Sequence, residues 1–284
     1  MADERTVEAI LDAVAACAPE IRTALPGRRV ESGETNPSGE LRLAADEYAD
    51  ELIQDRLAEI DGIGAYASEE DEEIVDLGTG LSVAVDPLDG SSNLKPNNTM
   101  GTIVGIYDAA LPASGRELVG AAYVLYGPIT TMAAAVGASV TEYVIREGER
   151  EAVEEGLTLP EEPSIYGFGG RVPDWTDAFT EYAREIESDE SLRLRYGGAM
   201  IGDVNQVLTY GGVFAYPALE SAPNGKLRLQ YEGNPIGYIV EAAGGASSDG
   251  ERSLLDVEPT ALHQRVPVHV GSSDLIDRLE ARLG

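Results

Sequence analysis

Basic residues are scarce in this sequence, and lysine is nearly absent. The 20 Lys and Arg residues stand against 51 Asp and Glu, a formal net charge of −31, and the only lysines are Lys95 and Lys226. A surface this acidic repels nucleic acid and anionic membranes, so neither is an expected partner. The carboxylates are spread along the chain, which excludes a separate acidic tail. Counter-ions screen such repulsion, and the composition is therefore typical of a halophile's protein.

Cysteine and long apolar runs are also missing. Cys17 is the only cysteine, which excludes an intrachain disulfide and is consistent with a reducing compartment. The apolar residues before it indicate a buried side chain rather than a nucleophile. The first ten residues lack the basic-then-apolar order of a signal peptide, and no apolar run reaches membrane-spanning length. These absences predict a soluble, cytoplasmic protein.

The rest of the composition predicts an α/β protein of two domains. A length of 284 residues with 43% hydrophobic residues and 32 glycines is enough for two ordinary cores. Periodicity and turn signals predict helices over 3–25, 41–60 and 175–186, and strands around Ile103 and over 119–125, 130–136, 164–168, 211–217 and 226–232. The charged stretch 146–163 indicates a solvated connection. We place the domain boundary near its end, giving domains over 1–160 and 161–284.

The stretch "VAVDPLDGSSN" is the strongest chemical signal in the first domain. A short β-branched run ends in Asp86 and Asp89, with a proline between them and Gly90 after them, as in a tight turn at a strand end. Two carboxylates this close repel unless a cation lies between them, and Mg²⁺ prefers such oxygen ligands. The hydroxyls of Ser91 and Ser92 and the nearby backbone N–H groups are suited to phosphate. An ordinary Asx-rich surface turn is the alternative explanation.

Two further stretches favour the chemical interpretation. Glu69 and Glu70 in "YASEEDEE" also follow an apolar segment, although in this chain an acidic patch is often only a solvated face. Lys226 in "KLRLQYEGNP" precedes Glu232, and a lysine kept in so acidic a chain suggests a need for positive charge, as for phosphate. Most lysines are simply exposed. Together, carboxylates, hydroxyls and a lysine indicate metal-assisted hydrolysis of a phosphate ester.

These residues also resemble a known family. "VAVDPLDGSSN", "ASEED", "YVLYGP", "RYGGAMIGDV", "GGVFAYP", "GKLRLQYEGNP" and "LHQR" occur in the order found in the fructose-1,6-bisphosphatases of the lithium-sensitive phosphatase superfamily. The match runs from about residue 36 to 273. It implies a layered α-β-α-β-α fold, with metal-binding loops in the first domain and a sugar-phosphate site in the second.

The resemblance implies a role for each matching position. Glu69, Asp86, the carbonyl of Leu88, Asp89 and Glu232 correspond to the ligands of two or more Mg²⁺ ions. Asp46 and Glu70 correspond to carboxylates that help deprotonate the attacking water, and Glu40 lies in a loop that closes over the metals. The positions that bind the substrate would be Asp89, Gly90, Ser91, Ser92, Arg195, Tyr196, Tyr216 and Lys226. Arg195 matches an arginine that reaches the neighbouring subunit's site, which implies a homo-oligomer, a dimer or a tetramer.

One departure from the family bears on the substrate. The family has an Asn and a Tyr in a "YSxNEGY" motif that binds the distal phosphate, whereas this chain has Gly169 and Gly170 in "IYGFGGRVP". Arg171 could compensate through its charge. Gly80, Leu81 and Asp108 replace residues that bind AMP in animal members, so we expect no AMP inhibition of that kind.

The expected activity is hydrolysis of the 1-phosphate of fructose 1,6-bisphosphate, a step of gluconeogenesis. Because of the glycine pair, a sedoheptulose 1,7-bisphosphatase or a broader sugar or inositol phosphatase stays open. A non-catalytic sugar-phosphate-binding regulatory protein is a further alternative, since a fold alone does not guarantee activity. Such a binder would not need the full set of carboxylates.

Overall fold

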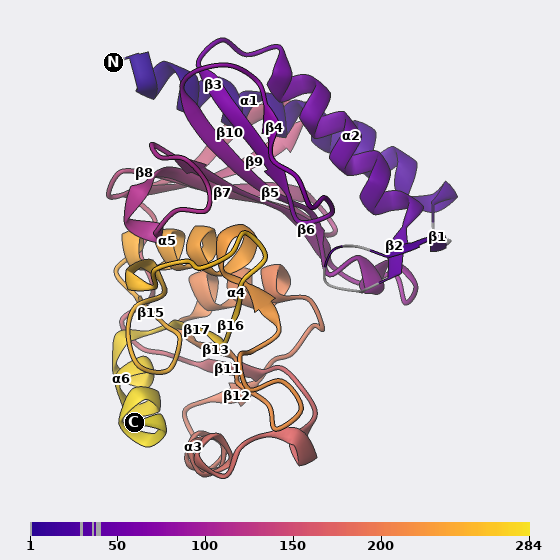
Figure 1. The fold of residues 1–284 in the computed structure, drawn as a ribbon. Helices are drawn as coiled ribbons and strands as arrows, with labels where there is room; N and C mark the ends of the chain where they lie inside the picture. The colour runs from indigo at the N-terminus through magenta and orange to yellow at the C-terminus, as the bar shows by residue number, and fades with distance from the viewer. Residues whose placement is uncertain (1, 29–30, 36, 38–40) are drawn as a thin grey trace.

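The computed structural model describes residues 2–28, 31–35, 37 and 41–284. They form five alternating layers of helices and sheets, which confirms the expected α-β-α-β-α architecture (Figure 1). Helix α1 (Ala2–Ala24) and helix α2 (Ala44–Ala58) form the first layer. Glu40, expected in a closing loop, lies outside the described residues.

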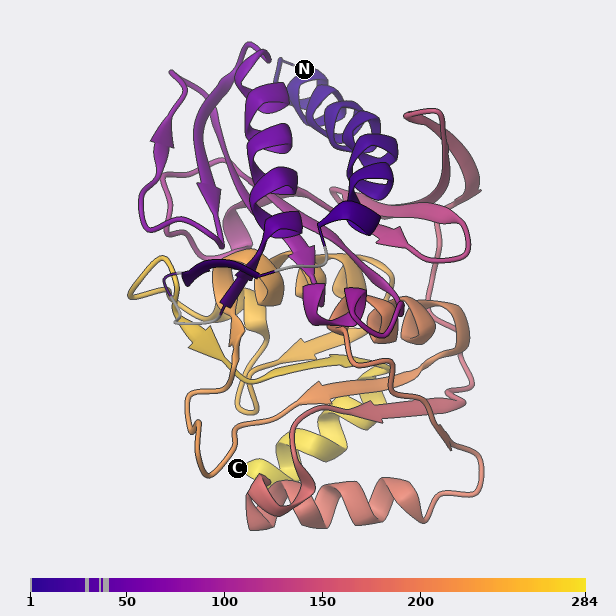
Figure 2. The same ribbon diagram turned by 90° about the vertical axis from the view of Figure 1, so that its right-hand side faces the viewer.

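An eight-stranded sheet forms the second layer. In spatial order its strands are β10 (Glu149–Glu155), β9 (Ser139–Arg146), β8 (Thr130–Val136), β7 (Leu118–Tyr126), β6 (Met100–Tyr107), β5 (Leu81–Asp89), β3 (Ile63–Ser68) and β4 (Val75–Asp76). Neighbouring strands are antiparallel except β3 and β5, which run parallel. Every residue of β5 and β6 is buried, because helices cover both faces of the sheet there. Figure 2 shows this layering from the side.

Helices α4 (Met200–Tyr210) and α5 (Asn234–Ala242) lie between the two sheets. Their apolar side chains, such as Val204 and Ile239, pack with Ile103 of the first sheet and Phe214 of the second in one continuous core. On the other face of the first sheet, Val104 packs with residues of α1 and α2. The alternation of side chains along β6 therefore supplies both cores.

A five-stranded sheet and two outer helices complete the layers. The strands are, in order, β12 (Arg193–Leu194), β11 (Ile165–Phe168), β13 (Gly212–Tyr216), β17 (Val268–Gly271) and β15 (Ala246–Ser248). Helices α3 (Asp177–Glu187) and α6 (Ser273–Leu283) cover its outer face through an aromatic cluster that includes Phe168, Phe179 and Tyr182. Two small ribbons pair β1 (Glu31–Thr35) with β2 (Leu41–Leu43) and β14 (Leu227–Arg228) with β16 (Arg265–Val266).

Most of the predicted elements are confirmed, and three predictions are wrong in part. Residues 41–43 form a strand rather than the first turn of a helix, because they pair with β1. The charged stretch 146–163 contains strand β10, which pairs with β9 and leaves its carboxylates exposed. Only 227–228 of the predicted strand 226–232 is extended, and a π-helical turn follows over Leu229–Gly233. The division at residue 160 stays a prediction.

Cys17 is buried in the core, as expected. Burial raises the pKa of its thiol to about 11, so the thiol stays protonated and unreactive at neutral pH. No helix in the described ranges is long and apolar enough to span a membrane.

Candidate active site

Six carboxylates gather around one cavity at the end of the first sheet, which we call the acidic cavity. Its volume is about 370 Å³. The carboxylates belong to Asp46, Glu69, Glu70, Asp86, Asp89 and Glu232, and each of these residues is between 3% and 9% exposed. So many buried acids in one place are costly for folding unless cations compensate them.

The parallel strands β3 and β5 place four of these carboxylates together. Ser68 pairs with Val85 at the strand ends, and the backbone N–H of Glu69 donates to the carbonyl of Val85 at 2.9 Å. Parallel strands end at the same edge of a sheet, so Glu69 and Glu70 lie beside Asp86. A β-bulge between Asp86 and Asp89 interrupts the pairing with β6.

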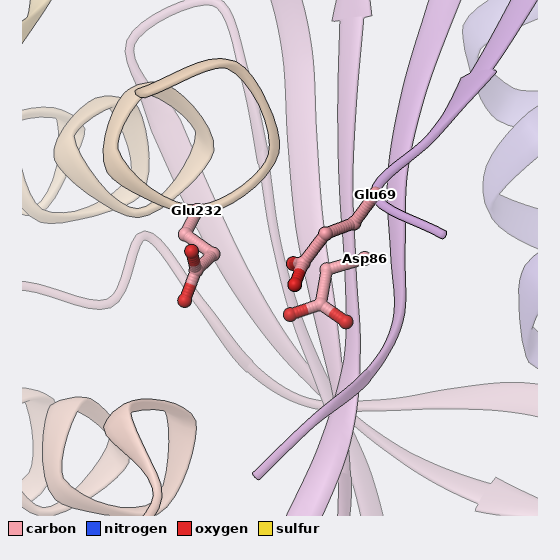
Figure 3. A group of neighbouring side chains, drawn as sticks. All are labelled: Glu69, Asp86 and Glu232. Carbon is pink, nitrogen blue, oxygen red and sulfur yellow. The ribbon is translucent and has the colours of Figure 1, made fainter. Parts of the chain in front are cut away.

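Glu232 approaches from the opposite side, from the π-helical turn before α5. Figure 3 shows its carboxylate facing those of Glu69 and Asp86. One oxygen from each of these three residues lies within 4.8 Å of the others. Carboxylate oxygens are the hard ligands that Mg²⁺ prefers, so the donor set fits a divalent cation, and Leu88 also lines the cavity.

The electrostatics of the cluster agree with this fit. The pKa of Asp86 lies well above its ordinary value because of burial and the negative charges of Glu69, Asp89 and Glu232. Burial likewise raises the pKa of Asp89 to about 7, although the backbone N–H of Ile201 donates to its carboxylate at 2.8 Å and opposes the shift. A bound cation would offset both the burial of these charges and the repulsion between them.

One arginine provides part of the missing positive charge. The Arg228 guanidinium contacts Glu69 at 2.8 Å, and both side chains are almost fully buried. The backbone N–H of Arg228 also donates to the carboxylate of Glu232 at 2.5 Å. Arg228 of strand β14 therefore holds the carboxylates of both Glu69 and Glu232 in place.

Helix α2 brings Asp46 to the cavity and is fixed to the sheet behind it. The carboxylate of Asp46 accepts a hydrogen bond from the backbone N–H of Leu43 at 2.7 Å, which caps the helix. One turn later, the hydroxyl of Tyr66 in β3 donates to Asp50 at 2.6 Å. Both residues are buried, so this hydrogen bond sets the position of α2 relative to Glu69.

The glycine after the two aspartates is required by a close approach. Gly90 has φ of 74°, and a Cβ there would lie 2.3 Å from the Cβ of Ala199. This turn places Ser91 and Ser92 along the wall of the acidic cavity.

A second cavity, of about 440 Å³, adjoins the first and shares Tyr216 and Lys226 with it. We call it the cationic cavity, because Arg171 and Lys226 both line it. Its other lining residues are Gly170, Asp174, Tyr196, Leu219 and Ser221. An anionic group held there would lie next to the carboxylate cluster.

The structure thus brings together nearly all the residues singled out from the sequence. Every predicted metal, catalytic and substrate position lines one of the two cavities except Arg195, which is exposed and lines neither within the described chain. Sequence reasoning missed Arg228, although it stands in the quoted "GKLRLQYE" stretch two residues after Lys226. It also missed the buried Asp203 of α4. The carboxylate of Asp203 accepts a hydrogen bond from the backbone N–H of Gly197 at 2.7 Å and so supports the loop that joins Tyr196 to α4.

An acidic cavity at strand ends beside a cationic one is the arrangement expected of α/β enzymes that act on phosphate esters with the help of metal ions. Two family models match this chain: "Fructose-1-6-bisphosphatase, N-terminal domain" over residues 5–154 and "Fructose-1-6-bisphosphatase, C-terminal domain" over residues 159–284. The chain belongs to the fructose-1,6-bisphosphatase family.

Curated relatives and solved structures agree with this assignment. A class 1 fructose-1,6-bisphosphatase of Natronomonas pharaonis is 59% identical over the whole of both chains. One of Halobacterium salinarum is 55% identical over 100% of this chain and 98% of the relative. The holo crystal structure of Leishmania major fructose-1,6-bisphosphatase superposes with a TM-score of 0.91 at 26% identity, covering 99% of this chain and 94% of that one.

Proposed function

We propose that this chain hydrolyses the 1-phosphate of fructose 1,6-bisphosphate and releases fructose 6-phosphate and phosphate, a step of gluconeogenesis. The observation that carries the proposal is the pair of adjoining cavities, one acidic and one cationic, which share Tyr216 and Lys226. The acidic cavity suits the phosphate that is removed together with its cations. The cationic cavity suits the phosphate that stays.

Glu69, Asp86, Asp89, Glu232 and the carbonyl of Leu88 would hold two or more Mg²⁺ ions. Such ions would lower the pKa of water and neutralise charge on the phosphate and on the leaving oxygen. The pKa of Asp86, raised by burial and by the charges of the neighbouring carboxylates, supports a cation there.

The chain's own residues would then prepare the reaction. Asp46 and Glu70 would accept a proton from the attacking water while its oxygen approaches phosphorus. The P–O bond to the sugar would break with its electron pair on the sugar oxygen, which would take a proton from water, while the carboxylates would return the proton they accepted to the solvent. Ser91 and Ser92 would donate hydrogen bonds to the phosphate that leaves. Tyr196, Tyr216 and Lys226 would bind the sugar and the distal phosphate.

The test is phosphate release with Mg²⁺ in molar KCl from fructose 1,6-bisphosphate, sedoheptulose 1,7-bisphosphate and inositol 1-phosphate. We expect a strong preference for the fructose ester and its loss in Asp89→Asn. Asp55→Asn, an exposed carboxylate on α2, is the matched control and should keep wild-type activity. Equal rates on all three esters would mean a broader phosphatase, and full activity in Asp89→Asn would refute the proposed site.

We also propose a homo-oligomer in which Arg195 contributes to a neighbouring subunit's site, and a location in a salt-rich cytoplasm. The exposure of Arg195 on the edge of the second sheet supports the first idea. Sedimentation in molar KCl tests it, and a monomer that is fully active would contradict it. The net charge of −31 supports the second idea, since salt should raise the melting temperature by screening repulsion. A melting temperature that does not change with KCl would count against it.

A further inference from the structure

The turn after strand β11 has no room for the side chains expected at Gly169. A Cβ added there would lie 2.4 Å from Cδ2 and 2.7 Å from Cε2 of Tyr216. Backbone and aromatic ring are therefore in direct contact, and the ring of Tyr216 occupies the space that a side chain at 169 would need. The backbone carbonyl of Gly169 also accepts a hydrogen bond from the indole N–H of Trp175 at 2.8 Å, which fixes it in place.

Gly170 then turns the chain in a way that presents Arg171 to the cationic cavity. Its φ of +85° lies in the left-handed region, and a Cβ there would lie 2.9 Å from Leu219 and 3.2 Å from the indole nitrogen of Trp175. The next residue, Arg171, is extended, and its carbonyl accepts from the backbone N–H of Asp174 at 2.8 Å. The backbone that carries the Arg171 side chain is therefore fixed on both sides, by the close contacts of Gly170 and by the hydrogen bond from Asp174.

Arg171 and Lys226 line this cavity without a carboxylate partner. Within residues 2–28, 31–35, 37 and 41–284, neither side chain forms a hydrogen bond or an ion pair. Other arginines, such as Arg150 and Arg278, contact carboxylates within 2.9 Å. What distinguishes Arg171 and Lys226 is that these two cations line the same cavity.

The nearest acid is already engaged by another residue. Both oxygens of Asp174 accept hydrogen bonds from Ser221, one from its backbone N–H at 3.0 Å and the other from its hydroxyl. These hydrogen bonds, with smaller contributions from the charges of Lys226 and Arg171, lower the pKa of Asp174. Asp174 is thus close enough to interact electrostatically with both cations but pairs with neither. The N–H donors of Arg171 and Lys226 are therefore suited to an anion from outside the chain.

We propose that Arg171 determines the specificity for sugar bisphosphates, because with Lys226 it binds the phosphate that is not removed. This inference rests on the proposed function and adds a residue to it. Gly169 and Gly170 do not simply weaken the site. They let Tyr216 pack against the backbone, and they present Arg171 to the cavity. The planar guanidinium of Arg171 can make two parallel hydrogen bonds to the phosphate that is not removed.

The first test compares two substrates of Arg171→Ala at one fixed KCl concentration. Fructose 1,6-bisphosphate carries both phosphates, whereas fructose 1-phosphate carries only the one to be removed. Loss of a charge-assisted contact should raise KM for the bisphosphate about tenfold or more, with kcat changed less than about twofold. The kinetic constants for fructose 1-phosphate should stay at wild-type values.

The second test measures binding without catalysis and without divalent cations. Fructose 6-phosphate has only the retained phosphate, so calorimetry reports the cationic cavity alone. We expect Arg171→Ala to weaken this binding about tenfold or more and Arg171→Lys to recover part of it, since lysine keeps the charge but not the fork. Arg184→Ala, an exposed arginine on α3, removes the same charge and should bind like wild type.

The outcomes separate this inference from the proposed function. If wild type releases no phosphate from either fructose ester, the proposed function fails. If wild type is active and Arg171→Ala binds fructose 6-phosphate normally, only the role of Arg171 is wrong. An equal loss on both substrates, or an equal loss in Arg184→Ala, would show a general effect of charge or folding and would also overturn it.

Discussion

The acidic and cationic cavities meet at Tyr216 and Lys226, yet the chain builds their charges in opposite ways. In the acidic cavity, several buried carboxylates lie around one buried arginine, Arg228. Their uncompensated negative charge lowers the stability of the folded chain. The cationic cavity instead has two exposed side chains, Arg171 and Lys226, that extend from the surface and have no ion-pair partner in the described chain. A cation bound in the acidic cavity should therefore raise the stability of the folded chain. An anion bound in the cationic cavity is needed only for substrate binding.

This difference predicts separate responses to substitution. A change in the acidic cavity should alter stability and catalysis together, because its charges repel one another in the folded chain. A change in the cationic cavity should alter binding and leave stability nearly unchanged, because exposed charges contribute little to folding.

The largest effect is expected for Asp86→Asn. The variant keeps the size of the side chain and an acceptor for the backbone N–H of Leu88, which donates to Asp86 at 3.0 Å. It should lose activity by about a thousandfold or more, as expected when electrostatic stabilisation of a transition state is removed. In chelator, however, its melting temperature should rise above that of wild type, because one charge has left a repelling cluster. Activity assays and thermal melts check both parts, and a lower melting temperature in chelator would contradict the account of the cluster.

Divalent cations should stabilise only through the acidic cavity. At about 100 times the dissociation constant, Mg²⁺ should raise the free energy of unfolding of wild type by about 2.7 kcal/mol. Denaturant unfolding with and without Mg²⁺ measures this difference. The difference should vanish in Asp86→Asn and stay unchanged in Arg171→Ala. If Arg171→Ala also loses it, the two cavities are not independent.

His269 tests the effect of burial on a pKa in the absence of neighbouring charges. In the carboxylate cluster these two effects act together and cannot be separated. Its ring is fully buried in the second sheet next to Phe179, and burial alone lowers its pKa to about 3. A base with a depressed pKa stabilises the fold fully above its unfolded pKa of about 6.5, and this stability is lost as pH falls toward 3. At pH 5 the loss should reach about 2 kcal/mol.

The measurement for His269 is denaturant unfolding of wild type and His269→Leu at pH 7.5, 6 and 5 in constant salt. The variant should gain on wild type by about 2 kcal/mol between the first and last pH. The chain has only two histidines, so His263→Gln serves as the control for the other one. A gap between wild type and His269→Leu that is constant with pH would mean that the ring is not held neutral.

The sequence predicted the local parts of the site well. Asp86, Asp89 and Gly90 follow one strand and one turn, so their spacing alone indicated that the carboxylates converge. The helix 2–24 was equally readable from its apolar stripe. In these cases the residues that decide the structure lie within a few positions of one another.

The predictions that were wrong in part depend on contacts with another segment, which the residues of the segment itself do not show. Residues 41–43 are extended because they pair with β1, and β10 is a strand because β9 lies beside it. The turn that carries Glu232 follows Arg228, whose guanidinium contacts Glu69 over 150 positions earlier, and the pattern of residues 226–232 does not show this contact. For Arg171, the sequence indicated the glycine pair before it but not the contact of Gly170 with Leu219.

The smallest effect is expected at the boundary between the turn and the ring of Tyr216. Gly169→Ala places a methyl group 2.4 Å from that ring, so the ring must shift, and the overpacking should lower the free energy of unfolding by about 1 kcal/mol. The shift should also raise KM for fructose 1,6-bisphosphate, because Tyr216 lines both cavities, while stabilisation by Mg²⁺ should stay at its wild-type value. Gly27→Ala is the matched control, since a Cβ there meets no atom within 4 Å in the described chain. Steady-state kinetics and denaturant unfolding of both variants decide the matter: an unchanged KM in Gly169→Ala would show that the position of Tyr216 does not matter for the retained phosphate, and a lost Mg²⁺ response would show that the ring supports the carboxylate cluster as well.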